Sequence, residues 1–351
     1  MRLGSPGKRD RLPPWLVPVV GYAVSIACLV WVLQGVDYAS LLDDLRSLHW
    51  RWVILGVAAD IGVYVYQAWR WNLLLSPVMQ PSMRRSVQAI YVGLFSNEVL
   101  PLRPGELIRS YLQARWGKIP FSVALSSALL ERVFDGIWLI IVFVLVTVGM
   151  QHKGIAMPAV MIELAKILGT GVAVAALILG LIMFWKHQAR RACPKTRWGA
   201  KLRVFIEDLH LMGKSRSFYY GALASLPYLL IQVIPIYALI RAYELTLGIG
   251  PALVVLVIWR VGTSIPQAPG NVGASQALMV LALSLFGVDK TTATGLSVVT
   301  WVVITLPLLI AGFIALTMTG TSIGTLRDAA RAHAANRPPH PVLVTETNGS
   351  E

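Results

Sequence analysis

The sequence has few charged residues for its length, and this shortage excludes a soluble enzyme. Only 14% of its 351 residues are Asp, Glu, Lys or Arg, whereas 56% are hydrophobic. A soluble domain usually carries about 25% charged residues. The mean hydropathy of +0.65 means that most side chains face lipid or a buried interior. The composition therefore predicts a polytopic membrane protein.

Cysteine and histidine are also scarce, which argues against a disulfide framework and against a metal site. Cys28 lies in an apolar run and Cys193 in a basic loop, so we expect no disulfide between them. The six histidines are scattered singly, without the spacing that gathers zinc ligands. A phosphate-binding motif of the form G-x-x-x-x-G-K-[ST] is missing as well. We therefore expect neither a metal nor a cofactor.

Long apolar stretches dominate what is present. A spanning helix needs about 20 mostly apolar residues, and the stretches that qualify are 15–33, 50–75, 122–149, 166–185, 218–242 and 293–318. Two further apolar regions, 87–116 and 251–288, contain Pro and Gly in the middle and do not fit simple spans. We expect an all-α membrane protein of about six transmembrane helices plus two re-entrant broken-helix hairpins. It would occupy residues 1–320, and the Pro-containing, polar residues 321–351 would form a disordered cytoplasmic tail.

The few charges are strongly biased, because the formal net charge is +14. Basic residues concentrate at the N-terminus, between 186 and 216, and after the last span. If the two broken regions re-enter without crossing, all these loops fall on one side of the membrane. Lys and Arg are enriched in cytoplasmic loops, so both termini are expected in the cytoplasm, at a bacterial-type inner membrane. No soluble basic domain remains that would bind nucleic acid.

The two broken regions share a motif of the form apolar-Pro-x-x-Pro-Gly-polar, at residues 100–106 and 265–271. Proline and glycine end helices, and unpaired helix ends inside a membrane must line protein or a wet cavity. The predicted helix breaks are Pro101, Pro104 and Gly105, and Pro266, Pro269 and Gly270. Three predicted spans separate the regions, so they would enter from opposite faces as an inverted repeat. Many transporters bind their substrate between such broken helices, although so short a motif also arises by coincidence.

Ionisable residues within the apolar segments are the candidate site, because each costs about 3 kcal/mol near the bilayer centre. The candidate substrate-binding residues are Glu98, Arg103, Glu106, Arg109, Glu131, Arg132, Asp135, Arg260, Gln267 and Asn271. In one interpretation they form a polar cavity whose arginines meet a phosphate. In the other they pair with one another and only fix the helix packing. For Glu131, Arg132 and Asp135 the sequence leaves both open, whereas Asp60 and Arg70 are expected to reach the membrane interface.

A resemblance to a known family lies in residues 97–106 with Arg109, in residues 128–135, and in residues 265–273 followed by residues 286–288. In these stretches the chain resembles the lysylphosphatidylglycerol synthase transmembrane region, a flippase-like integral membrane protein family. The resemblance extends over about residues 15 to 320. In bifunctional members of that family, a soluble domain transfers lysine from aminoacyl-tRNA to phosphatidylglycerol. The membrane region is credited with moving the lipid between leaflets. Since the sequence contains no such soluble domain, the resemblance implies a stand-alone lipid translocator.

The expected function is therefore translocation of a phospholipid, an aminoacyl-phospholipid or another polar-headed lipid that is held in a central polar cavity. The alternative is an intramembrane enzyme or an accessory subunit acting on a lipid-linked (glyco)lipid, with Glu131 and Asp135 as an acid–base pair. An enzyme is the less favoured reading, because no His, Ser or metal constellation accompanies those carboxylates. The expected partners are membrane lipids, and a second copy of the chain or a lipid-synthesising enzyme is a further candidate.

Overall fold

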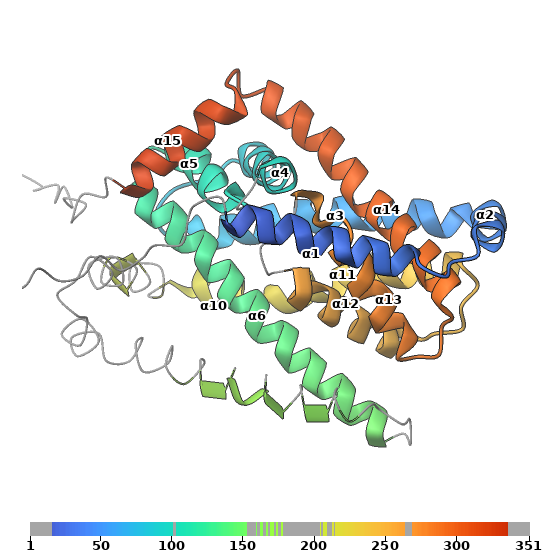
Figure 1. Ribbon diagram of the computed structural model, residues 1–351. Helices are drawn as coiled ribbons and strands as arrows, with labels where there is room; N and C mark the ends of the chain where they lie inside the picture. The colour runs from blue at the N-terminus through green and yellow to red at the C-terminus, as the bar shows by residue number, and fades with distance from the viewer. Residues whose placement is uncertain are drawn as a thin grey trace, which may run out of the picture.

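The computed structural model describes residues 16–100, 103–152, 215–263 and 269–335, together with scattered positions between 159 and 213. Every regular element within these residues is helical (Figure 1), which confirms the predicted class. In chain order the elements are α1 (Leu16–Leu33), α2 (Tyr38–Arg46), α3 (Trp50–Leu75), α4 (Met83–Val99), α5 (Gly105–Gly117), α6 (Phe121–His152), α10 (Arg216–Leu223), α11 (Ser225–Ala242), α12 (Ile249–Thr263), the turn η1 (Pro269–Asn271), α13 (Ala274–Ser284), α14 (Lys290–Thr317) and α15 (Ile323–Ala335).

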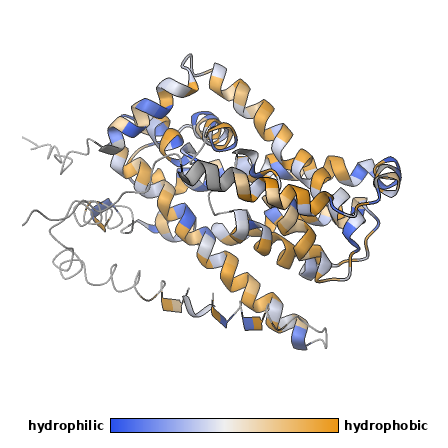
Figure 2. Cartoon of the chain, viewed as in Figure 1, coloured by the Kyte–Doolittle hydropathy of each residue, from blue (hydrophilic) through white to orange (hydrophobic). Residues whose placement is uncertain are grey.

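Four helical stretches of the described part are long and apolar enough to cross a membrane, namely α3, α6, the α10–α11 pair and α14. They contain 26 to 32 residues, or about 40 Å and more at 1.5 Å per residue. Large apolar side chains such as Ile54 and Leu145, each 65% exposed, point outward along them. Such a surface requires lipid around it. In Figure 2 hydrophobic residues follow these helices, and hydrophilic ones gather in α2 and α15 at opposite ends.

The helices agree with most of the predicted spans. The four stretches correspond to the predictions at 50–75, 122–149, 218–242 and 293–318, and α1 corresponds to 15–33. The predicted span at 166–185 lies largely outside the described residues. The multi-pass membrane architecture is therefore established.

The first broken region consists of two helices that pack against each other. Helix α4 ends at Val99 and α5 begins at Gly105, with Pro104 at its N-cap position. Between them Arg103 has a left-handed backbone, with φ of 48°, which turns the chain sharply. Pro101 lies outside the described residues.

The second broken region is interrupted between α12 and α13, where the turn η1 lies. Its Gly270 and Asn271 have left-handed φ angles of 71° and 50°, a conformation that Gly adopts freely and Asn more readily than most residues. Helix α4 packs directly against η1, so the two interruptions lie side by side within the bundle. Pro266 and Gln267 lie outside the described residues.

The chain after the last span is helical at first, contrary to the prediction of a disordered tail. Helix α15 packs against α5, and the ring of its His333 lies 5.1 Å from that of Tyr111. An amphipathic segment that finds an apolar surface on the bundle gains enough from burial to stay helical. The prediction is therefore wrong for Ile323–Ala335.

Two apolar cores hold the helices together. One is built mainly from α11, α12, α13 and α14, with Leu239 and Val255 fully buried at 0% exposure. The other is built mainly from α3, α4 and α5, with Trp71 and Ile108 equally buried. Members of both cores line one internal cavity, so the cavity lies where the two cores meet.

A methyl group added at Gly105 should destabilise the protein, because this residue lets α5 approach α4. A Cβ built there would lie 2.0 Å from the carbonyl oxygen of Gly93, and neither backbone yields easily. We expect Gly105→Ala to cost about 1–3 kcal/mol, the usual effect of overpacking, measured by thermal unfolding in detergent. The matched control is Gly62→Ala on α3, where nothing lies within 4 Å of an added Cβ and stability should hold or rise. Equal losses in both variants would refute the close approach.

Candidate functional site

A cavity of about 510 Å³ lies inside the bundle, where the two broken regions meet. Pockets of this size accommodate small organic groups. Its charged lining residues are Glu98, Arg103, Glu106, Arg132, Asp135 and Arg260. The lining therefore holds three cationic and three anionic side chains, drawn from α4, α5, α6, α12 and the break before α5. We call this cavity the chamber.

The chamber brings together most of the residues that the sequence nominated. Besides the six charged residues, Asn271 lines it, as does the predicted helix-break residue Gly270. Arg109 and Glu131 do not line it but form ion pairs with residues that do. Gln267 lies outside the described residues.

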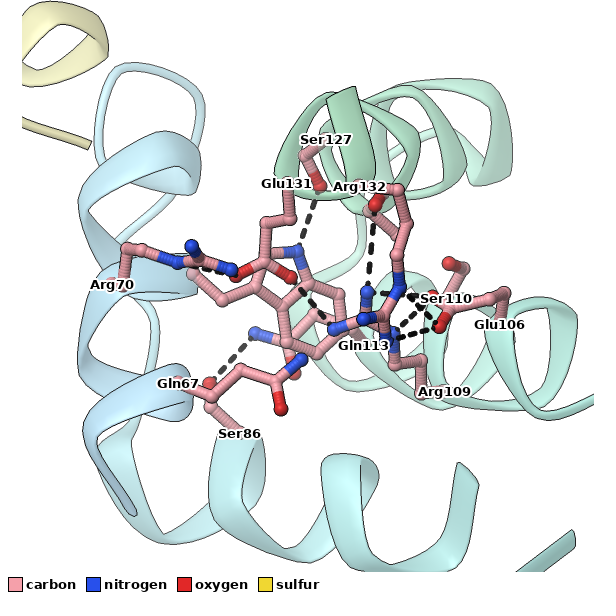
Figure 3. Close-up of polar contacts among 12 residues, drawn as sticks. Gln67, Arg70, Ser86, Glu106, Arg109, Ser110, Gln113, Ser127, Glu131 and Arg132 are labelled. Carbon is pink, nitrogen blue, oxygen red and sulfur yellow. Dashed lines mark hydrogen bonds and ion pairs between the residues drawn. The ribbon is translucent and has the colours of Figure 1, made fainter. Parts of the chain in front are cut away.

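Three arginines and three carboxylates form a closed ring of alternating charge beside the chamber. The ion pairs run in the order Arg70–Glu131 (3.1 Å), Glu131–Arg109 (2.8 Å), Arg109–Glu106 (2.6 Å), Glu106–Arg132 (2.6 Å) and Arg132–Asp135 (3.8 Å), and Asp135 returns to Arg70. In Figure 3, Arg70 and Arg109 approach Glu131 from two sides. The six formal charges cancel, which allows the group to be buried in the bundle. We call this arrangement the charge ring.

The charge ring has a buried half and a half that faces the chamber. The side chains of Arg70, Glu131 and Arg109 are 0%, 0% and 3% exposed, and all their charge is met within the protein. By contrast the side chains of Arg132, Glu106 and Asp135 are 38%, 25% and 20% exposed and line the chamber. The buried half therefore fixes α3, α5 and α6 to one another, and the other half is accessible to a ligand. The pairing interpretation therefore describes the buried half, and the half that faces the chamber remains the candidate for ligand binding.

Further contacts satisfy the buried arginines. Arg70 also donates to Oγ of Ser225 at 2.8 Å, and its guanidinium lies 4.3 Å from the ring centre of Tyr228. The guanidinium of Arg109 lies 4.7 Å from the ring centre of Trp71. A buried guanidinium is stable only when its donors are used, and aromatic faces add a favourable cation–π term.

The expectation that Asp60 and Arg70 reach the membrane interface is wrong. Arg70 is completely buried and Asp60 is only 6% exposed. Both are among the buried residues of α3, and Arg70 meets Glu131 and Asp135 of α6, so their side chains enter the bundle. A sequence shows that a helix carries a charge, but the face that turns inward depends on its neighbours.

Two hydrogen bonds tie the broken regions to each other and to the bundle. Arg103, at the first break, donates to the backbone oxygen of Thr263 at the end of α12, at 2.5 Å. Trp301 of α14 donates to the backbone oxygen of Gly270 at 2.8 Å. These contacts hold the irregular backbone of both breaks at the chamber wall, where its polar groups find partners.

Several lining residues were not predicted from the sequence. Tyr64 and Gln67 on α3, and Tyr228 and Gln232 on α11, line the chamber together with Trp259. The two glutamines are isolated amides in apolar spans, and that signal was available, because polar residues inside membrane helices usually face the bundle interior. The aromatic residues carry no comparable signal, since they are equally common in lipid-facing positions.

The chemistry of the chamber suits a ligand that is itself polar or charged. Arginine side chains donate paired hydrogen bonds to phosphate or carboxylate, and the carboxylates accept from ammonium or hydroxyl groups. Within the part of the chain that the structure describes, no group of three or more His, Cys, Asp or Glu is arranged to hold a metal ion. The site as described is a chamber of mixed charge.

Membrane-crossing helices, two interrupted regions and a charged chamber between them define a polytopic α-helical membrane protein with an internal polar site. The sequence model of the family described as "Lysylphosphatidylglycerol synthase TM region" matches residues 19–312. The chain belongs to this family, which confirms the resemblance seen in its motifs and places it among membrane proteins that act on lipids. No curated protein matches the chain.

Removal of the central carboxylate of the charge ring should destabilise the fold. Glu131→Gln leaves Arg70 and Arg109 without their shared counter-charge, and breaking a buried ion pair in this way costs about 3–5 kcal/mol. Thermal unfolding in detergent measures the loss. Glu98→Gln is the matched control, because Glu98 lines the chamber without belonging to the ring, and we expect it to change stability by less than about 1 kcal/mol. The ring would have no structural role if the two variants unfolded alike.

Proposed function

We propose that this protein moves a polar-headed lipid between the leaflets of the membrane without changing it chemically. The lipid headgroup occupies the chamber, and its acyl chains remain in the hydrocarbon. The observation that carries the proposal is the charged chamber of about 510 Å³ at the meeting point of two helix breaks. Membership of a family whose membrane region acts on lipids supports it.

In this proposal, the accessible charges of the chamber bind different parts of the headgroup. Arg103, Arg132 and Arg260 line the chamber and would meet the phosphate. Glu98 and Asp135 would accept from ammonium or hydroxyl groups on the same headgroup. A phospholipid, an aminoacyl-phospholipid and a glycolipid phosphate all present this chemistry.

We further propose that the two broken regions enter the membrane from opposite faces as an inverted repeat, with both termini in the cytoplasm. Their shared motif and the direct packing of α4 against η1 support this arrangement. Movement of one region relative to the other would open the chamber to each face in turn, as in transporters built from inverted repeats. The proposed protein partners are a lipid-synthesising enzyme or a second copy of the chain.

Truncation of Arg103 should slow lipid movement, because it removes a phosphate ligand at the chamber wall. Purified protein in phospholipid vesicles is assayed with a fluorescent phospholipid that dithionite quenches from the outside only. We expect Arg103→Ala to lower the exchange rate at least about tenfold, since a hydrogen bond to a charged group contributes about 1.5–3 kcal/mol. Arg46→Ala is the matched control, because the side chain of Arg46 is 79% exposed on α2, and it should exchange lipid at the wild-type rate.

The same vesicles distinguish a carrier from an intramembrane enzyme. Chromatography of the extracted lipid should return only the starting phospholipid after exchange has gone to completion. Formation of a new lipid that depends on the protein would favour the enzyme instead. If Arg103→Ala and Arg46→Ala exchanged lipid at the same rate, the chamber would not be part of the transport path.

A further inference from the structure

The buried carboxylate of Asp60 belongs neither to the charge ring nor to the chamber lining. Asp60 on α3 is 6% exposed, and its Oδ2 atom has no hydrogen-bond partner. An ionised carboxylate without partners is expensive inside a membrane protein, whereas its protonated form is tolerated. The environment of Asp60 is therefore suited to a group that gains and loses a proton.

The packing of α3 on α11 shows where this carboxylate lies. The two helices run antiparallel, because a Cβ on Gly56 would contact Leu239 and Gln67 accepts from the hydroxyl of Tyr228 at 3.3 Å. Asp60 lies between these two contacts on the buried face of α3. It is therefore level with the middle of α11.

Near this level, Gln232 of α11 binds an arginine that faces the chamber. Arg260, from α12, donates to Oε1 of Gln232, and both residues line the chamber. The positive charge of Arg260 acts on Asp60. Tyr64, one helical turn from Asp60, completes this part of the wall. The guanidinium of Arg260 can therefore interact both with a ligand in the chamber and with the carboxylate of Asp60.

We propose that Asp60 is the proton-binding residue that couples lipid movement to a proton gradient, and this rests on the proposed function. When Asp60 is ionised, it attracts the guanidinium of Arg260 and competes with a ligand phosphate for it. When Asp60 is protonated, this competition is absent, and Arg260 attracts the phosphate more strongly. Proton binding to Asp60 and phosphate binding in the chamber therefore favour each other, and the coupling is reciprocal.

The tyrosines and the arginine that interact with Asp60 are not groups that change charge near neutral pH. Tyr64 on its own helix and Tyr91 on α4 interact with it electrostatically, and phenols ionise near pH 10. Arg260 stays charged throughout. Glu98 on α4 acts on Tyr64 and lines the chamber, so it is the second carboxyl that the experiment must separate from Asp60.

Calorimetry of ligand binding tests the coupling directly. The probe is dihexanoyl phosphatidylglycerol, whose phosphodiester does not titrate between pH 6 and 8. Binding to the full-length protein is measured in buffers of different ionisation enthalpy. We expect the wild type to take up as much as one proton per ligand, and its affinity to fall by up to about tenfold per pH unit as the pH rises. Asp60→Asn should take up none and bind equally well at both ends of the range.

Three further variants make this result specific. Asp43→Asn removes a carboxylate that is 76% exposed on α2 and should take up protons like the wild type. Glu98→Gln should still take up protons on binding, even if its affinity changes. Asp60→Glu keeps a carboxyl group and should retain proton uptake, so it serves if Asp60→Asn fails to fold. Unchanged proton uptake in Asp60→Asn, or its loss in Glu98→Gln, would overturn the proposal.

Vesicles with an imposed pH difference test the transport consequence. The wild type should move the fluorescent phospholipid faster and in one net direction, and Asp60→Asn should exchange it without responding to the pH difference. A sodium gradient at uniform pH should not change the rate of phospholipid movement. A faster rate with sodium would contradict the proposal that the proton is the coupling ion. If binding takes up a proton at Asp60 but no lipid moves, the proton site stands and the proposed lipid transport fails.

Discussion

A charge inside a bilayer is costly unless a partner group meets it, and this constraint organises the centre of the protein. Arg70, Arg109 and Arg132 alternate with three carboxylates in one closed ring. Because the ring joins α3, α5 and α6, neutralising the charges also fixes the relative positions of three helices. Removal of a buried member such as Glu131 takes a counter-charge from both of its neighbours inside the bundle. The chamber can therefore carry accessible charge beside a rigid wall.

The position of the ring relative to the chamber gives it a second use. Its chamber-facing members are partly exposed, and the widest contact in the ring, 3.8 Å between Arg132 and Asp135, lies on that side. Each of these two residues keeps a shorter contact with another ring member. A ligand with both a positive and a negative group would replace the longest contact at little cost. This feature of the ring is compatible with the proposed binding of a headgroup that carries both charges.

The helix breaks supply the other half of the site. Irregular backbone is tolerated at membrane depth only where protein or a wet cavity satisfies it. Here Arg103 binds the backbone of Thr263, and Trp301 binds that of Gly270. The two interruptions thus support each other, and they open a space that two continuous helices would fill.

Much of the architecture follows from the sequence, because apolar length and helix-breaking residues act locally. The spans at 50–75 and 122–149 coincide with α3 and α6, and the family follows from motifs that lie within single segments. The helical α15 was not predicted, because its order comes from packing against α5 and not from its own composition. Local signals fail where a distant surface supplies the stabilisation.

The sequence by itself determined which residues carry charge into the membrane, since a charge in an apolar segment is visible without a fold. Only the tertiary structure decided what each charge does. Arg70 and Arg132 look alike in sequence, yet one is sealed in the ring and the other faces the chamber. Asp60 looked like an interfacial residue and lies buried beside Arg260. The reason is that burial and pairing depend on which helices meet, and residues as far apart as 60 and 260 come together only when the bundle is assembled.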